Sequence, residues 1–95
     1  MIEISLMERK DQHLNIQKEA HELFLRKNKD YGDSFADYGP IGVIVRMGDK
    51  IKRLITVTQS GVHMVQDESV RDTLIDLHNY AAMAVMLIDD TPSGN

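Results

Sequence analysis

Apolar residues recur at helical spacing in three separate stretches of the chain. The first covers about residues 6–27, and Gly32 follows it. Its stripe recurs at steps of three, four and seven: Leu6, His13, Ile16, Ala20 and Leu23. Ser5 and Glu8 have the spacing of a capping box, in which each side chain satisfies a free amide of the first turn. This pattern predicts an amphipathic helix over residues 6–27.

A second stripe follows Pro40, a residue that suits the first turn of a helix because its missing N–H needs no partner there. The stripe runs to about residue 58 and consists of Ile44, Met47, Ile51, Leu54 and Ile55. The sequence therefore predicts a second helix over residues 40–58, with this stripe as its packed face.

The third stretch has the most regular pattern, with alternating steps of four and three between apolar positions. It covers residues 68–89, with Asp67 placed to cap it, and its seam is Val70, Leu74, Leu77, Ala81, Ala84 and Ile88. We therefore expect an all-α fold, a single domain over residues 1–95 with three main helices in a bundle. A chain of 95 residues covers little apolar surface by itself, so we expect a homo-oligomer, dimer or tetramer, to complete the bundle.

Between the first two stretches, residues 28–39 read NKDYGDSFADYG. The composition of this segment predicts a polar loop interrupted by glycines. It holds three aromatic residues, although aromatics make up only 5% of the chain.

Charge and composition exclude several classes of protein. The net charge of −4 disfavours broad binding to duplex nucleic acid, which needs a basic face for the phosphates. The chain has no cysteine, which excludes disulfides, thiol nucleophiles and cysteine-ligated metals. No apolar run has the length of a transmembrane helix. We expect a cytoplasmic protein that makes no membrane contact.

Two sets of charged residues fall on helix faces. Arg46, Asp49, Lys50 and Arg53 share one side of the second helix, and Glu68, Asp72 and Asp76 share one side of the third. If the two strips face each other, the cations suit the phosphates of a ligand and the carboxylates suit Mg²⁺. The alternative is that the strips form inter-helix ion pairs or lie in water.

Other candidate site residues point less clearly to a chemical role. Glu19 and Glu22 are three apart and could join a metal site, although such a pair is more often a solvated helix face. The histidines lack zinc-binding spacing, and no phosphate-loop, dinucleotide-binding or serine-hydrolase motif is present.

Three strings together resemble a known family over roughly residues 20–88: KNKDYGDSF, RMGDKIKRL and DESVRDTLIDLHNYA. The family is the nucleotide modification associated domain of the first type, met often in bacteriophages. It is similar in turn to the all-α nucleoside triphosphate pyrophosphatases of the MazG and dimeric dUTPase type. The resemblance implies that the protein acts inside a bacterial cell or a phage-infected host cell.

The resemblance also implies a reaction and a site: binding of a (deoxy)nucleoside triphosphate, with Mg²⁺-assisted cleavage between its α- and β-phosphates. Asp72 and Asp76 would be the catalytic, metal-binding pair, with Glu68 or Asp49 as a further metal ligand. Arg46, Lys50 and Arg53 would bind phosphate, and Asp30, Tyr31 and Gly32 would shape the base or sugar pocket.

The sequence departs from the MazG pattern in one respect. Arg46 and Asp49 stand where the resemblance places the two acids of an ExxE motif, and Lys50 and Arg53 follow. Cations bind phosphate but do not activate water as a metal does. The alternative function is therefore a non-catalytic module that binds a nucleotide or partners a base-modifying enzyme. A DNA-binding regulator is disfavoured by the charge and by the lack of a basic recognition helix.

Overall fold

The computed structural model describes residues 7–60 and 68–90, with the backbone alone of Tyr31. In these residues the chain forms three α-helices, one short 3-10 helix and no strand. The α-helices are α2 (Arg9–Tyr31), α3 (Gly39–Gln59) and α4 (Glu68–Asp90), and the 3-10 helix η1 (Ser34–Ala36) lies between α2 and α3. The all-α prediction with three main helices is confirmed. None of the described helices is long and apolar enough to cross a membrane.

The ends of α2 differ from the expectation. It begins at Arg9, with Glu8 at the N-cap position in an extended conformation and without a side-chain cap bond, while Ser5 and Asp67 lie outside the described residues. At the other end, α2 continues past Lys27 to Tyr31, so the prediction of a loop from residue 28 was wrong. The polar residues before Gly32 tolerate a helix, and the chain turns only at the glycine. The ends of α3 and the end of α4 lie within one residue of the prediction.

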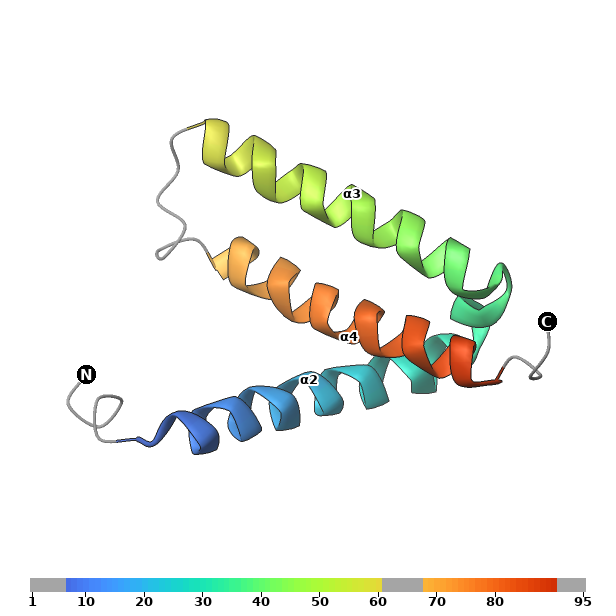
Figure 1. Cartoon of the computed structure of the whole chain (residues 1–95), viewed down its shortest axis with the longest axis horizontal. Coiled ribbons are helices and arrows are strands. Elements are labelled where there is room, and N and C mark those ends of the chain that lie inside the picture. Colours follow the sequence, from blue (N-terminus) through green and yellow to red (C-terminus); the bar gives the residue numbers. More distant parts are fainter. Residues whose placement is uncertain (1–6, 61–67, 91–95) are drawn as a thin grey trace.

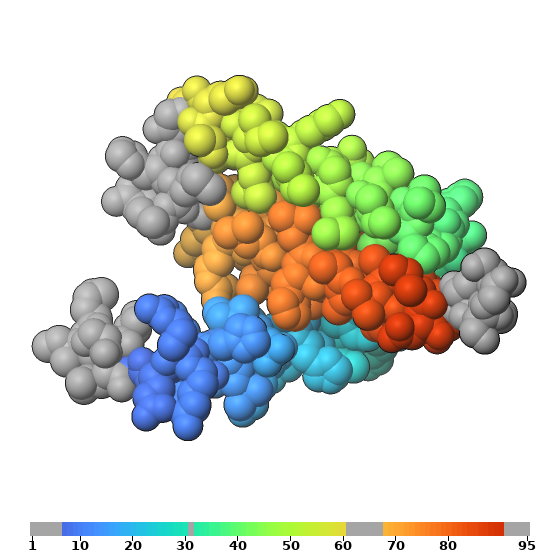
Figure 2. Space-filling view, in the orientation of Figure 1, coloured from blue at the N-terminus to red at the C-terminus, as the bar shows by residue number. Residues whose placement is uncertain are grey.

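Helix α4 lies in the middle of the molecule. Figure 1 shows α3 antiparallel to α4 along one side, and α2 along the other. Figure 2 shows the side chains of α4 packed between those of its two neighbours. The contact of α4 with α3 is more extensive than its contact with α2.

The core is small because few apolar side chains are fully covered. The buried apolar residues of the described chain are Ala20, Val43, Val70, Ile75, Ala84 and Leu87. The half-buried side chains Phe35, Tyr80 and Met83 pack against the cluster of Val43, Ala84 and Leu87. This cluster joins α3 to α4 and places η1 beside them.

The predicted stripes are only partly buried. On α3, Val43 is buried and Met47 and Leu54 are half-buried, but Ile44, Ile51 and Ile55 are exposed. On α4, Val70 and Ala84 are buried, whereas Leu74, Ala81 and Ile88 are exposed. The single-seam prediction for α4 was wrong because this helix is contacted from two sides. Burial therefore extends over a wider arc that includes Thr73, Ile75, Asn79 and Leu87.

One buried hydrogen bond ties α2 to α4. The Asn79 amide nitrogen donates to the backbone oxygen of Ala20 at 3.0 Å. Both residues are buried, so the bond forms away from water, and its loss would leave a buried polar group without a partner. It fixes the middle of α2 against α4.

Candidate functional site

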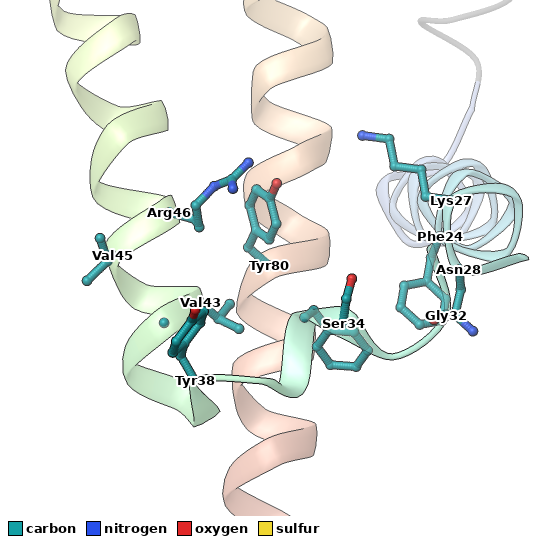
Figure 3. Close-up of a pocket in the computed structure, with 12 residues that line it drawn as sticks. Phe24, Lys27, Asn28, Gly32, Ser34, Tyr38, Val43, Val45, Arg46 and Tyr80 are labelled. Atoms are coloured by element: carbon teal, nitrogen blue, oxygen red, sulfur yellow. The ribbon is translucent and has the colours of Figure 1, made fainter. Parts of the chain in front are cut away.

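A cleft opens between α2, η1, α3 and α4. Its volume is about 800 Å³, within the range of small-molecule sites. We call it the aromatic cleft, and it is lined by Phe24, Lys27, Asn28, Gly32, Ser34, Phe35, Tyr38, Gly42, Val43, Val45, Arg46 and Tyr80. Figure 3 shows ten of these residues labelled, and they come from all four elements.

Aromatic rings form much of its wall. The rings of Phe24 and Phe35 meet edge to face, with centroids 6.4 Å apart and an interplanar angle of 75°. Phe35 and Tyr80 also pack against the core cluster, so the core holds these rings in place. Such a wall favours a flat apolar or aromatic ligand group.

Two glycines allow the chain to shape the cleft. Gly32 has φ +62° and ψ −143°, a conformation that side-chain-bearing residues avoid, and its N–H donates to the Asn28 backbone oxygen at 2.7 Å. It ends α2 and turns the chain into η1. At the start of α3, a Cβ on Gly42 would lie 2.7 Å from the Tyr38 Cβ, closer than real contacts allow.

The polar side chains of the aromatic cleft are two cations, an amide and three hydroxyl-bearing residues, Ser34, Tyr38 and Tyr80. Lys27 and Arg46 extend toward the opening from α2 and α3, with the Tyr80 hydroxyl between them in Figure 3. Arg46 has no ion-pair partner among residues 7–60 and 68–90. The Asn28 Oδ1 atom is shielded from solvent and accepts no hydrogen bond from the described part of the chain. An unsatisfied buried acceptor of this kind costs about 1–3 kcal/mol.

A second, smaller cleft of about 380 Å³ lies between α2 and α4. We call it the acidic cleft, and it is lined by Glu19, Leu23, Arg26, Lys27, Asp72, Ile75 and Asp76. Lys27 lines both clefts and separates them.

The acids of this second cleft make ion pairs within the protein. The Lys27 Nζ lies 3.1 Å from Asp76 Oδ1, and the Lys50 Nζ lies 3.6 Å from Asp76 Oδ2. The Asp76 side chain is only 18% exposed, and its two pairs link α4 to both α2 and α3. The ion-pair alternative for the charged strips therefore holds for Asp76 and Lys50.

Glu19 and Arg71 form a bidentate pair between α2 and α4. The Arg71 Nη2 donates to Glu19 Oε1 at 2.7 Å, and its Nη1 donates to Oε2. This hydrogen bonding lowers the pKa of the Glu19 carboxyl and raises the pKa of Arg71. Both side chains remain about half exposed, so the pair adds little to stability.

The expected phosphate and pocket residues do not all line one cleft. Arg46 and Gly32 line the aromatic cleft, whereas Lys50 is engaged with Asp76. Arg53 and Asp30 are exposed and line neither cleft. The side chain of Tyr31 lies outside the described residues.

The expected metal ligands do not all line one cleft either. Asp72 and Asp76 line the acidic cleft, but Glu68 and Asp49 line neither cleft. Across residues 7–60 and 68–90, no three His, Cys, Asp or Glu side chains converge in a geometry that could hold a metal ion. With Asp76 already paired to two lysines, this arrangement of side chains does not fit the expected Mg²⁺ site.

Sequence reasoning missed several lining residues, among them Phe24, Lys27 and Asn28. A signal for them existed, because Phe24 and Asn28 are four apart and share a helix face once α2 extends to Tyr31. The aromatics of residues 28–39 were a second signal, since Phe35 and Tyr38 both line the cleft.

Comparison with known protein families gives evidence that is independent of this geometry. The family model of nucleotide modification associated domain 1 matches residues 27–88, more than half of the chain. The chain belongs to this family. The matched range of the nucleotide modification associated domain contains every residue that lines the aromatic cleft except Phe24. No curated protein and no solved structure matches the chain.

Proposed function

We propose that this nucleotide modification associated domain binds a nucleoside phosphate in the aromatic cleft. The observation that carries the proposal is the meeting, in one cleft, of aromatic rings and two cations. In a chain with a net charge of −4, Arg46 brings to the opening a positive charge that no acid among residues 7–60 and 68–90 pairs with, and this charge attracts an anion.

Each part of a nucleotide has a counterpart in this cleft. The base and sugar would lie against the wall of Phe24 and Phe35 and beside Tyr80, where aromatic contacts stabilise a flat ring. The phosphates would lie near Arg46, whose planar guanidinium forms two parallel hydrogen bonds to phosphate oxygens. Lys27 keeps donors for a phosphate while it pairs with Asp76, because an ammonium group has three.

Isothermal titration calorimetry with a panel of nucleoside mono-, di- and triphosphates tests the proposal. A charge-assisted hydrogen bond contributes about 1.5–3 kcal/mol, so Arg46→Ala should weaken binding by about ten- to a hundredfold. Arg26→Ala is the matched control, since Arg26 is an exposed arginine of the acidic cleft, and it should change affinity by about twofold or less. Equal losses in the two variants, or no binding of any nucleotide to the parent protein, would contradict the proposal.

Pyrophosphohydrolysis of the bound triphosphate, as in MazG-type enzymes, is the second candidate. It is favoured by the acids Glu19, Asp72 and Asp76, which line a cleft separated from the aromatic cleft by Lys27. Because these acids do not form a metal cage as they stand, we derive no metal-dependent step. Incubation of the nucleotide panel with Mg²⁺, with detection of released pyrophosphate, tests this candidate. Release that persists in Asp72→Asn would contradict a role for this acid.

A homo-oligomer is also part of the proposal, because α3 and α4 keep apolar stripes in contact with solvent. Ile44, Ile51 and Ile55 on α3 are 46–50% exposed, and Leu74, Val85 and Ile88 on α4 are 49–56% exposed. Full burial of an exposed side chain of this kind contributes about 1.5–3 kcal/mol, so a second copy that covered the exposed half would contribute about half of that for each residue. Light scattering should show a dimer or larger species, and a stable, folded 10.8 kDa monomer would contradict this.

A further inference from the structure

We propose that two copies of this chain associate through one face of the α3–α4 pair, so that α3 and α4 of both copies form a four-helix bundle with each α2 outside it. This inference rests on the homo-oligomer of the proposed function and adds which surface pairs and which surfaces stay open. We call this surface the isoleucine face, and it consists of the exposed apolar residues Ile44, Ile51, Ile55, Leu74, Ala81, Val85 and Ile88.

The exposed stripes of α3 and α4 lie on the same side of the pair. Val43 and Ala84 are buried where α3 meets α4, and the next residues, Ile44 and Val85, are 50% and 56% exposed. One residue turns a helix by about 100°, so both helices turn in the same sense from the buried to the exposed position. Because α3 and α4 run antiparallel (Figure 1), this equal turn brings both stripes to one side.

Helix α2 does not cover this side. It contacts α4 through Asn79, whose side chain donates to the Ala20 backbone oxygen. Asn79 follows Leu74 by five residues, so it lies about 140° round the helix from the exposed stripe of α4. The isoleucine face is therefore free of contacts with α2 and available to a second copy.

The face also leaves the aromatic cleft open. Arg46 follows Ile44 by two residues, so it lies about 160° round α3 from the exposed stripe. A second copy on the isoleucine face would therefore leave Arg46 accessible to a ligand, and each copy would keep a complete cleft.

The distribution of charge favours a second copy as the occupant. The charged residues of α3 and α4 project away from the isoleucine face, except that Lys52 and the titratable His78 lie at its edges. Two chains that each carry a net charge of −4 can therefore associate through this face without bringing their acids together. A two-fold axis would pair the face with itself, as in most homodimers.

The size of the face suits a dimer. Helices α3 and α4 have 21 and 23 residues. At a rise of 1.5 Å per residue they are about 32 and about 35 Å long, and two helices about 10 Å wide present about 650 Å² side by side. Two such faces bury about 1,300 Å² in total, within the range of about 1,200–2,000 Å² for specific interfaces.

Light scattering of charge variants tests the location of the interface. Ile51→Glu and Leu74→Glu change residues that are 46% and 49% exposed in the single chain, so each chain should still fold. In the dimer the new carboxylates would be buried without partners, so the measured mass should fall to 10.8 kDa. Leu25→Glu is the matched control, since Leu25 is 52% exposed on α2, and it should leave the parent mass unchanged.

Thiol labelling gives a second readout that introduces no charge. The chain has no cysteine, so Ile51→Cys and Leu25→Cys each provide a single thiol. Residues 51 and 25 have similar exposure in the single chain, so the two thiols should react with a maleimide at similar rates in a monomer. In the proposed dimer, Ile51→Cys should react several times more slowly than Leu25→Cys.

The outcomes separate this inference from the proposed function. A parent dimer that persists in both glutamate variants, or equal labelling of the two thiols, would mean that the copies associate through another face. Dissociation by Leu25→Glu as well would show that the effect is not specific to the isoleucine face. A monomeric parent would refute both the inference and the proposed homo-oligomer. None of these measurements contains nucleotide, so failure of the nucleotide site would appear only in the calorimetry.

Discussion

The two clefts of this domain share Lys27 but differ in how their polar groups are used. In the acidic cleft, Asp76 is paired with two lysines and Glu19 is paired with an arginine. In the aromatic cleft, Arg46 has no ion-pair partner and the Asn28 oxygen no donor within the described ranges. Charged groups that already satisfy each other hold helices together, whereas a charged group without a partner beside an open space, such as Arg46, is available to a ligand. We therefore propose that the aromatic cleft binds the ligand and that the ion pairs of the acidic cleft hold the helices together.

The largest expected effect in this comparison is at Asp76. Asp76→Asn removes the charge that joins Lys27 and Lys50, so it should destabilise the fold by about 2 kcal/mol, between the values of exposed and buried ion pairs. Asp72→Asn changes an exposed acid on the same helix and should alter stability by about 0.5 kcal/mol or less. Urea unfolding in metal-free buffer measures both. Equal stabilities of the two variants would mean that Asp76 is not a structural link.

The difference between the two acids also shows what the sequence can predict. Spacing correctly placed Asp72 and Asp76 on one side of α4, because a helix brings residues four apart to the same face. Spacing alone cannot tell which lysine reaches which acid, because that depends on how three helices pack. Lys27 was assigned only to the end of its helix, and its contacts with Asp76 and with both clefts appear only in the folded chain.

The same limit applies to the packed faces. Three helical stripes identify three helices and an all-α fold, since the 3.6-residue period is a local property. Ile75 and Asn79 fall off the predicted seam of α4, yet both are buried because α2 covers a second side of that helix. The sequence did not predict the aromatic cleft, for a related reason. Its lining residues come from four elements, and the periodicity within one helix does not show which other elements it packs against.

A smaller effect is expected where the chain turns into the aromatic cleft. Gly32→Ala puts a side chain at φ +62°, so it should cost about 1–2 kcal/mol and loosen η1 against α2. Gly48→Ala is the control, because a Cβ there meets nothing within 4 Å and alanine favours a helix interior. Its stability should rise slightly. Thermal melting of the two variants measures both effects, and a loss of stability of the same size in Gly48→Ala would show that Gly32 has no special role.

The smallest effect is expected at the exposed pair of Glu19 and Arg71. Since the fold lowers the pKa of Glu19, its ionised form stabilises the protein above the ordinary glutamate pKa of about 4.3, and this contribution is lost as the pH falls through the lowered value. Between about pH 5 and about pH 3, the parent should therefore lose slightly more melting temperature than Glu19→Gln. A larger loss in the variant would contradict this assignment.

The most direct test of the comparison between the two clefts is a nuclear magnetic resonance titration of the ¹⁵N-labelled protein with a nucleoside triphosphate. The account predicts that the amide signals that shift most belong to the aromatic cleft, around residues 24–28, 32–35 and 42–46 and at Tyr80. Signals around Glu19 and Asp72 should shift less. Shifts concentrated around Glu19 and Asp72, with the aromatic cleft unchanged, would contradict the assignment of binding to the aromatic cleft.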